Sequence, residues 1–523
     1  MPNREPMSVE KADLVLHDGV VAGHAESDSV AIANGRITAH GRFSELKALV
    51  GPRTHLIRLN GRTVAPGFVD CHLHFMEAAA ATAGIAVSRG RTIADLLADL
   101  RIAAGRIPPG NWMRAFGCDE ALLQEGRGPT RAELDQSTPK NPLRLRHQTL
   151  HASWLNSRAI GLLGLERPDF EPPAGATLYR DRNGRLTGLV VGMEEWISSR
   201  LPRVTAAEVE ARARVFSREL AAAGITAFTD ATVRNGPQDF ALFADLIASG
   251  AILQHTALMA GPHCVATATE LRRQSEERGV WLAAIKFTDV HRWEPRQLAK
   301  TVADALAQEV DCAFHCTEVE ELDAALGAIE AARERLGPKA LARTTCRIEH
   351  GGLIPPEYPE RLAATGSWVV TNPGFLYYRG MKYAADPGLL PYLYRARSLL
   401  GAGVRMAAGT DAPVTPAKPL AAIAAAISRI SMEGYELGLD EALDPTSATA
   451  LFVSAAAQLS RLEAGAIAPG LLADLIVMPT DPTTVAPHEL PHLPIDLTLI
   501  GGRVIYERGR PVIASSAGAP GAD

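Results

Sequence analysis

The sequence has little cysteine, no excess of basic residues and no long apolar run. Six cysteines in 523 residues are too few for a disulfide framework, and they lie in apolar, strand-like runs, so we expect them to be reduced. A net charge of −6 provides no basic face for nucleic acid or anionic lipid. No stretch reaches the roughly 18 apolar residues of a membrane span, and the N-terminus lacks the apolar core of a signal peptide.

These absences exclude several classes of protein. We expect a cytoplasmic protein with no nucleic-acid or membrane partner. The expected partners are a small-molecule substrate and, at most, a second copy of the chain in a homodimer. Hydrophobic residues at 47% and charged residues at 21% are ordinary for a soluble globular enzyme with a large core.

The middle of the chain alternates short apolar runs with long alanine-rich helical stretches, a pattern typical of parallel βα units. The candidate strands are 67–74, 225–230, 253–259, 283–288, 312–315, 346–350, 368–371 and 404–408. Eight such units close as a (β/α)8 TIM barrel of the α/β class, and the active site of such a barrel lies at the C-terminal ends of its strands.

Both ends of the chain carry further strand-like runs, with Asp18-Gly19, Asn34-Gly35 and Asn60-Gly61 as hairpin-type turns in the first half. Neither end alone has enough strands for a stable sheet domain. We therefore predict one small β-sandwich domain built from residues 8–63 and 464–513.

The barrel then spans residues 64–463 and contains one exception to the alternation. Residues 84–205 carry strands and helices of their own between the first two barrel strands, which predicts an inserted lid subdomain over the barrel mouth. The last ten residues, 514–523, contain nothing to bury, and we expect a mobile tail.

The stretch VAPGFVDCHLHF at 64–75 reads as one buried strand that ends in two histidines. Because side chains alternate along a strand, His72 and His74 point the same way. Two neutral imidazoles side by side form half of a metal site. A histidine pair alone has the ordinary alternative of a surface or core pair, so the other strand ends decide the matter.

Four further candidate ligands follow at the ends of other predicted strands: Lys286, His315, His350 and Asp411. Each alone has an ordinary explanation, such as a buried histidine bonded to backbone. Their joint occurrence at the ends of strands one, four, five, six and eight predicts a metal centre at the barrel rim.

Lys286 needs separate reasoning, because an ammonium cannot bind a cation. A buried lysine lowers its pKa, and the neutral amine can add carbon dioxide to form a carbamate whose oxygens bridge two metal ions. Two alternatives remain open: an ion pair with Asp289, and a lysine that forms a Schiff base. The four histidines favour the metal.

Taken together, these motifs resemble the amidohydrolase superfamily, specifically amidohydrolase family 3, the YtcJ-like branch that includes the N-substituted formamide deformylases. The resemblance covers nearly the whole chain. The matching motifs are APGFVDCHLH at 65–74, DEALLQEGRGPTRAELD at 119–135, LHASWLNSRAI at 150–160, RIEHGGLI at 347–354, GTDAPV at 409–414 and APGLLADLIV at 468–477.

The resemblance implies a role for each ligand. His72 and His74 would bind the more buried metal, and Lys286, as a carbamate, would bridge to a second metal bound by His315 and His350. Asp411 would bind metal and shuttle protons. Zinc is the expected ion, with manganese or cobalt as alternatives, in one or two copies. After the lysine the branch usually has a glycine-rich acidic stretch, whereas this chain reads FTDVHRWEP.

This site predicts a metal-dependent hydrolase (EC 3.5.-.-) in which a metal-bound hydroxide cleaves a non-peptide C–N bond of amide, formamide, carbamate or urea type, with Lys286 and Asp411 as catalytic residues. The substrate is expected to be hydrophobic or aromatic. The candidate substrate contacts are Phe75, Met76, His151, His291, Phe375, Tyr377 and Tyr378. An ester or lactone hydrolase on the same metals and a non-catalytic scaffold with this fold are the alternatives.

Overall fold

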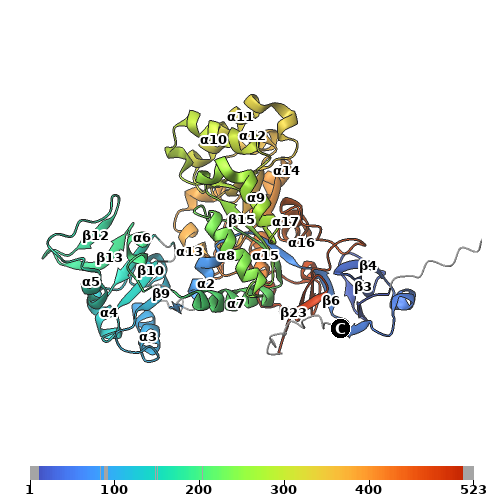
Figure 1. Ribbon diagram of the computed structural model, residues 1–523, viewed down its shortest axis with the longest axis horizontal. Coiled ribbons are helices and arrows are strands. Elements are labelled where there is room, and N and C mark those ends of the chain that lie inside the picture. Colours follow the sequence, from blue (N-terminus) through green and yellow to red (C-terminus); the bar gives the residue numbers. More distant parts are fainter. Residues whose placement is uncertain are drawn as a thin grey trace, which may run out of the picture. The chain divides into compact units, whose positions relative to one another are not determined.

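The computed structural model describes residues 11–82, 84–87, 92–147, 149, 151–202 and 204–509. The predicted tail and the outermost residues of the predicted sandwich therefore lie outside the described residues. The chain forms two compact units, which are Met1–His74 with Ser217–Asp523, and Phe75–Phe216. Figure 1 labels the elements of both units along the chain.

An eight-stranded parallel sheet forms the centre of the first unit. Its strands, in sheet order, are β7 (Phe68–Leu73), β14 (Ile225–Asp230), β15 (His255–Ala260), β16 (Val280–Phe287), β17 (Cys312–Cys316), β18 (Cys346–His350), β19 (Trp368–Thr371) and β20 (Arg405–Ala408). Each predicted barrel strand corresponds to one of these strands. The prediction of an α/β TIM barrel is confirmed.

The first and last strands of this sheet approach each other at Gly409. A Cβ atom on Gly409 would lie 2.5 Å from Cβ of His72 and 2.6 Å from its backbone nitrogen, closer than real atoms allow. Only glycine fits there, because it has no Cβ. The close approach places the segment after β20 directly beside His72 of β7.

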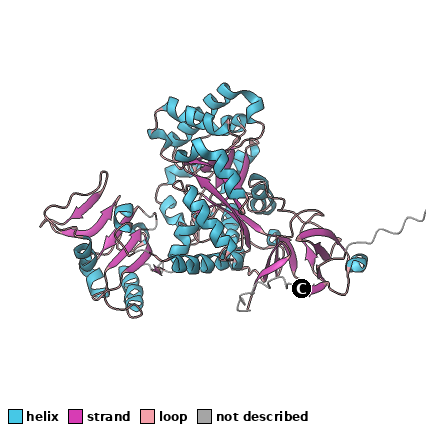
Figure 2. Ribbon diagram, viewed as in Figure 1, coloured by secondary structure: helices cyan, strands magenta, loops and turns pink. Residues whose placement is uncertain are grey.

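Helices follow the barrel strands and lie outside the sheet, as Figure 2 shows in cyan around the magenta strands. They include α8 (Pro237–Ala248), α9 (Ala268–Glu276), α10 (Pro295–Leu306), α11 (Val319–Leu341), α12 (Tyr358–Thr365), α13 (Gly374–Ala384), α14 (Ala396–Gly401), α15 (Pro419–Ser428) and α17 (Ser454–Leu459). In α10 the buried residues Leu298, Val302 and Leu306 recur every four positions, the spacing of a helix with one apolar face.

Two smaller sheets bring the ends of the chain together. One has the order β4 (Arg36–Gly41), β3 (Ser29–Ala33), β1 (Leu14–His17) and β5 (His55–Arg58). The other has the order β2 (Val20–Val21), β6 (Thr63–Pro66), β21 (Leu475–Met478), β22 (Leu497–Ile500) and β23 (Arg503–Glu507). In the second sheet β6 pairs antiparallel with β21, so strands more than 400 residues apart share hydrogen bonds. Both sheets contribute to one apolar core.

The turns of this region correct one prediction. Asn34-Gly35 does join two antiparallel neighbours, β3 and β4, with positive φ at both residues. Asp18-Gly19 and Asn60-Gly61 do not form hairpins, because each leads the chain from one sheet into the other. Positive φ at Asp18, Asn60 and Gly61 fixes the local bend, whereas packing of the two sheets decides which strand each run pairs with.

The second unit contains a six-stranded sheet. Its strands, in sheet order, are β12 (Thr177–Arg180), β13 (Leu186–Val191), β11 (Ala152–Leu155), β10 (Leu143–His147), β9 (Met113–Cys118) and β8 (Ile85–Ala86). The unit is wider than the predicted insertion of 84–205, because α2 (Phe75–Thr82) and the first part of α7 (Ala206–Ala222) belong to it. Its role as a lid stays a prediction.

Two of the absences noted in the sequence have structural counterparts. All six cysteines are buried and unpaired. Within the described part of the chain, every helix is too short or too polar to cross a bilayer.

We predict that Asp474 stabilises the junction between the end sheets and the barrel. Its buried carboxylate accepts a hydrogen bond from the Gly501 backbone N–H at 2.8 Å and lies 2.9 Å from Nε2 of His255 on β15. Asp474→Ala leaves both groups without this partner and should lower the free energy of unfolding by about 2–4 kcal/mol. Asp245→Ala, at an exposed ion pair with Arg278, should change it by less than about 0.5 kcal/mol. Urea denaturation of both variants tests this prediction, and equal changes in their free energies of unfolding would contradict it.

Candidate metal centre

The predicted ligands lie at the C-terminal ends of five barrel strands. His72 is in β7 and His74 follows it, while Lys286, His315 and His350 lie in β16, β17 and β18. Asp411 follows β20. In the parallel ladder Lys286 lies opposite Ala313, and Cys316 lies opposite His350. Candidate ligands that are far apart in the sequence thus lie at the same end of the barrel.

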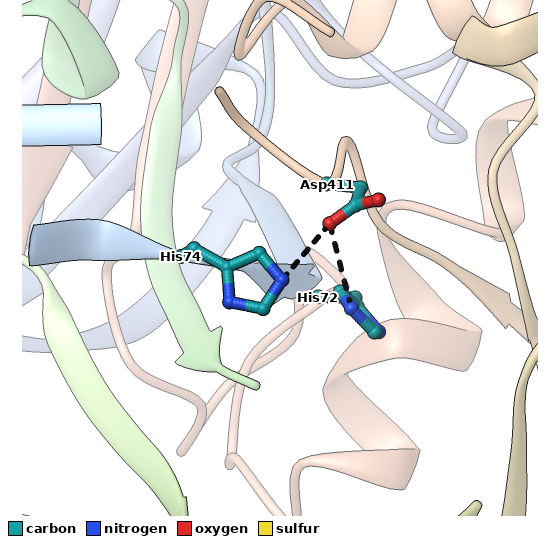
Figure 3. A group of neighbouring side chains, drawn as sticks. All are labelled: His72, His74 and Asp411. Atoms are coloured by element: carbon teal, nitrogen blue, oxygen red, sulfur yellow. Dashed lines mark ion pairs between the residues drawn. The ribbon is translucent and has the colours of Figure 1, made fainter. Parts of the chain in front are cut away.

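Three of these side chains converge on one point. Oδ1 of Asp411 lies 3.2 Å from Nε2 of His74 and 3.6 Å from Nε2 of His72 (Figure 3). One ligand atom from each residue lies within 4.8 Å of the others. His72 and Asp411 are buried, and His74 is partly exposed. This geometry suits a divalent ion held between two imidazoles and a carboxylate.

The position of the proton on His72 follows from its other ring nitrogen. Nδ1 of His72 contacts Oε2 of Glu349, a carboxylate with no exposed surface. Nδ1 therefore carries the proton, and the lone pair of Nε2 faces Asp411. A carboxylate behind a metal-binding histidine fixes both its tautomer and its orientation.

Glu349 is in turn held by Arg347 from the same strand. Nε of Arg347 donates to Oε1 of Glu349 at 2.5 Å, and Nη2 donates to the carbonyl oxygen of Cys71 at 2.7 Å. Both side chains are almost completely buried. The arginine compensates the buried carboxylate charge and ties β18 to β7 directly beside His72.

His315 and His350 form the second imidazole pair. Nε2 of His350 lies 3.0 Å from Nδ1 of His315. The amide of Asn372 donates to the carbonyl oxygen of Gly409, so its own oxygen faces Nδ1 of His350 at 2.7 Å. Nδ1 of His350 must then carry the proton, and Nε2 presents a lone pair toward His315.

The backbone is held in an unusual conformation at two candidate ligands. His350 has φ of 70° and Asp411 has φ of 56°, in the left-handed region that residues other than glycine seldom adopt. Backbone hydrogen bonds hold this part of the barrel end: Asp411 N donates to His72 O at 2.7 Å, and His74 N donates to Ala412 O at 2.7 Å. Such strain is typical of functional sites.

Asp70 holds the segment after β20 against β7 through hydrogen bonds. Its Oδ2 accepts a hydrogen bond from the hydroxyl of Thr410 at 2.5 Å, and its Oδ1 accepts from the backbone nitrogens of Thr410 and His72. Burial raises the pKa of Asp70 to about 7, against the lowering effect of these hydrogen bonds. Asp70 thereby connects β7 to the segment that carries Asp411.

Lys286 is buried, and Nζ has no hydrogen-bond partner among the described residues. Burial lowers the pKa of Lys286, which favours the neutral amine. The carboxylate of Asp289 is 62% exposed and lies 3.8 Å from Arg292, so the structure gives no support to the ion pair with Lys286.

The charges around the centre favour metal-binding forms of its residues. Burial holds the pKa values of His72 and His350 well below the ordinary value, and burial also lowers the pKa of His315. Burial alone would raise the pKa of Asp411, but the imidazoles of His74 and His72 outweigh it, and the pKa lies below its usual range. Neutral imidazoles and an ionised carboxylate are the forms that bind a divalent ion.

The candidate substrate contacts fall into both units. In the first unit the ring of Phe375 stacks on His350 with centroids 6.2 Å apart, and Tyr377 packs in the same apolar cluster. Tyr378 is buried beside Tyr377, and His291 is exposed and lies 3.9 Å from Glu321.

In the second unit Phe75 is fully buried against Phe216, with ring centroids 5.2 Å apart, which is a packing arrangement. Met76 is partly buried, and His151 is exposed. The assignment of these residues as substrate contacts stays a prediction.

A second cluster of possible ligands lies in the second unit, formed by Asp119, Glu120 and His147. The backbone nitrogen of Thr149 donates to Nδ1 of His147 at 3.0 Å. The proton of a neutral His147 is therefore on Nε2, which lies 3.2 Å from Glu120. Because this nitrogen carries the proton in a neutral His147, it has no lone pair to offer an ion, and we assign no metal to the cluster.

A model of the amidohydrolase family matches residues 55–506. The chain belongs to the amidohydrolase family. It is 26% identical over 529 residues to an N-substituted formamide deformylase of Arthrobacter pascens, a match that covers 94% of this chain and 96% of that protein. It is 25% identical to a Bacillus subtilis protein named as the amidohydrolase YtcJ, over 92% of this chain and 96% of that protein.

A solved structure agrees with the fold. A metal-dependent hydrolase of unassigned role from Pyrococcus horikoshii superposes with a TM-score of 0.70 at 19% identity, over 91% of this chain and 99% of that chain. The family membership makes this chain a hydrolase, and both the predicted family and the predicted enzyme class are confirmed.

We predict that Glu349 sets the metal affinity of this centre through His72. Glu349→Gln keeps the size of the side chain but removes the charge that orients the imidazole, so the dissociation constant for zinc should rise by about 10–100-fold. Competition with a chromophoric chelator measures the dissociation constant for zinc. Glu276→Gln, an exposed glutamate on α9, is the matched control and should leave the constant unchanged. Unchanged zinc affinity in a folded Glu349→Gln protein would show that Glu349 has no such role.

Proposed function

We propose that this chain is a metal-dependent hydrolase that cleaves a non-peptide C–N bond in a small apolar substrate, of the amide, formamide, carbamate or urea type. The observation that carries this proposal is the convergence of His72, His74 and Asp411, with the His315–His350 pair at the same end of the barrel. Membership of the amidohydrolase family supports it, as does the similarity over nearly the full length to an N-substituted formamide deformylase.

The donor set fits one or two divalent ions. His72, His74 and Asp411 would hold the first ion, and His315 and His350 would hold a second together with a carbamate on Lys286. Imidazole and carboxylate donors favour zinc, with manganese or cobalt as further candidates. An ion bound there would make a water molecule more acidic and would polarise the carbonyl group of the substrate.

Asp411 moves the proton in this proposal. The attacking water forms a bond to the carbonyl carbon, and its proton passes to the carboxylate of Asp411. The C–N bond then breaks, and Asp411 returns the proton to the leaving nitrogen, so an amide and water give an acid and an amine. Because its pKa is held below the usual range, Asp411 is ionised at neutral pH, so its carboxylate carries no proton before the reaction.

Lys286 supplies the remaining donor group. Its amine nitrogen attacks carbon dioxide, a new C–N bond forms and one proton is released, which leaves a carbamate with one negative charge. The absence of a hydrogen-bond partner for Nζ among the described residues supports this assignment, because a buried ammonium would require one. A carbamate provides two oxygen ligands where an amine provides none.

Aromatic side chains favour an apolar substrate. Phe375 stacks on His350 and also packs edge-on against Tyr394, with ring centroids 6.2 Å apart in each pair. These rings place an apolar wall directly behind one imidazole pair. An aryl or alkyl group on the substrate would bind more favourably against such a wall, because apolar surface leaves water on both sides.

We expect chelation to abolish amide hydrolysis and zinc, manganese or cobalt to restore it. Asp411→Asn keeps the shape of the side chain but removes the proton acceptor, so kcat should fall by about 10²–10⁴-fold. The surface variant Asp245→Asn should retain full activity. The assay is release of amine from a panel of N-substituted formamides, carbamates and ureas, with matched esters and lactones.

Each outcome of this assay decides the proposal. Faster turnover of the C–N substrates than of the matched esters supports it, and the reverse would assign the site to ester hydrolysis. Turnover that survives both chelation and Asp411→Asn would rule out the mechanism. Lack of turnover on the whole panel by metal-loaded protein would contradict the substrate class.

A separate prediction concerns Lys286 and does not require turnover. Protein prepared with ¹³C-labelled bicarbonate and zinc should show one carbamate carbon resonance by NMR. Lys286→Met, which keeps the chain length without the amine, should abolish that resonance. Lys300→Met, at an exposed lysine paired with Asp304, should retain it. A wild-type spectrum without the resonance would contradict the carbamate.

A further inference from the structure

A cavity of about 630 Å³ in the first unit is lined by an unusual concentration of arginine. Among the described residues that line it, Glu309 is the only acidic one. We call this cavity the arginine basin. Its arginines are Arg272, Arg333, Arg343, Arg405 and Arg461. The whole chain has a net charge of −6, so this cavity has a positively charged lining in a protein whose net charge is negative.

The arginine basin lies at the opposite end of the barrel from the metal centre. Arg405 is the first residue of β20, Thr345 directly precedes β18, and Gly366 lies just before β19. These are the N-terminal ends of strands whose C-terminal ends carry the metal-centre residues. The basin is therefore separate from the catalytic end of the barrel.

The five guanidinium groups have two carboxylate partners in the described part of the chain, Glu309 and Asp311, so part of the positive charge is uncompensated. Arg333 donates to the carbonyl oxygen of Thr365, and Arg405 donates to that of Gly366 at 2.7 Å. These main-chain acceptors satisfy N–H groups but carry no net negative charge. Arg343 lies 3.3 Å from Glu309, and its side chain is 77% exposed. Several like charges around one cavity repel, and a bound anion would relieve that repulsion.

Arg461 and Arg272 lie where the arginine basin meets a second cavity of about 680 Å³. Arg461 donates to both carboxylate oxygens of Asp311, at 2.9 and 3.0 Å, and Arg272 donates to the carbonyl oxygen of Glu309. The two cavities share Arg272, Arg461 and Glu309 as lining residues. One elongated ligand could therefore extend from one cavity into the other.

The second cavity differs chemically from the arginine basin. Trp281 lines it and is 43% exposed, an uncommon position for a tryptophan at the start of a barrel strand. Besides apolar side chains, its lining has four carboxylates and three arginines, so its charge is more nearly balanced. The carboxylates are Glu276, Glu309, Asp311 and Glu463, and the arginines are Arg272, Arg347 and Arg461. A flat ring would stack on Trp281, whereas an anion would prefer the basin.

We propose that these adjoining cavities bind a nucleoside diphosphate, with its phosphoryl groups in the arginine basin and its base against Trp281. Guanidinium groups match phosphate oxygens in geometry and in charge, and several of them favour a ligand with more than one phosphoryl group. The cavity volume exceeds what an inorganic phosphate would fill. The exposed tryptophan accounts for the aromatic part of the ligand.

Calorimetric titration of the metal-loaded protein with ADP, pyrophosphate and adenosine tests the proposal. ADP should bind more tightly than pyrophosphate, and adenosine should bind weakest. Arg272→Gln and Arg343→Gln should each raise the dissociation constant of ADP by roughly tenfold. Trp281→Ala should weaken ADP and leave pyrophosphate unchanged. A tightening of ADP binding at low salt should accompany these effects, because charge dominates the contact.

The matched control is Arg273→Gln, which changes the neighbouring residue on α9. Arg273 pairs with Glu270 and Glu277 and does not line either cavity, so ADP binding should remain within twofold of wild type. Equal effects of Arg272→Gln and Arg273→Gln would overturn the site, as would absence of ADP binding. Pyrophosphate binding as tight as that of ADP would overturn the nucleoside part. Thermal melting confirms that each variant is folded.

Discussion

The contact between Glu349 and Nδ1 of His72 is the constraint on which the rest of the metal centre depends. A carboxylate with no exposed surface is costly to bury, and Arg347 compensates it while also holding the carbonyl of Cys71. The contact exists only when β18 and β7 are both in place, because their residues are more than 270 positions apart. It also aims the lone pair of Nε2 at Asp411. Folding of the barrel and preparation of the site are therefore the same event.

Closure of the barrel serves the site in a second way. Gly409 lets the segment after β20 pass against His72, and Asp70 holds Thr410 in that segment. Asp411 follows directly, in a left-handed conformation supported by the hydrogen bond from its backbone nitrogen to the carbonyl oxygen of His72.

The other end of the strands carries positively charged arginines where the metal centre has neutral imidazoles. Arg347 lines the second cavity there, so one buried side chain reaches from that cavity to Glu349.

The sequence predicted the barrel well, because eight apolar runs between amphipathic helices leave little choice of architecture. The catalytic end was predicted from the joint occurrence of six candidate ligands at the ends of five strands, and not from His72 and His74 alone. Glu349 and Asp70 were not assigned, although both stand within the quoted motifs, since a carboxylate in an apolar strand gives no sign of what it faces after closure. Two of the three Asx-Gly turns lead from one sheet to the other, although the sequence predicts hairpins, because a turn fixes a bend but not a strand partner. The substrate class, a homodimer and a cytoplasmic location depend on contacts beyond one chain, and they stay predictions.

The most direct measurement is anomalous X-ray diffraction from crystals of zinc-loaded protein, with data on both sides of the zinc absorption edge. The account predicts an anomalous peak bonded to Nε2 of His72, Nε2 of His74 and the carboxylate of Asp411, with any second peak beside His315 and His350. An anomalous peak elsewhere, with His72, His74 and Asp411 bonded only to one another in zinc-loaded crystals, would contradict the account.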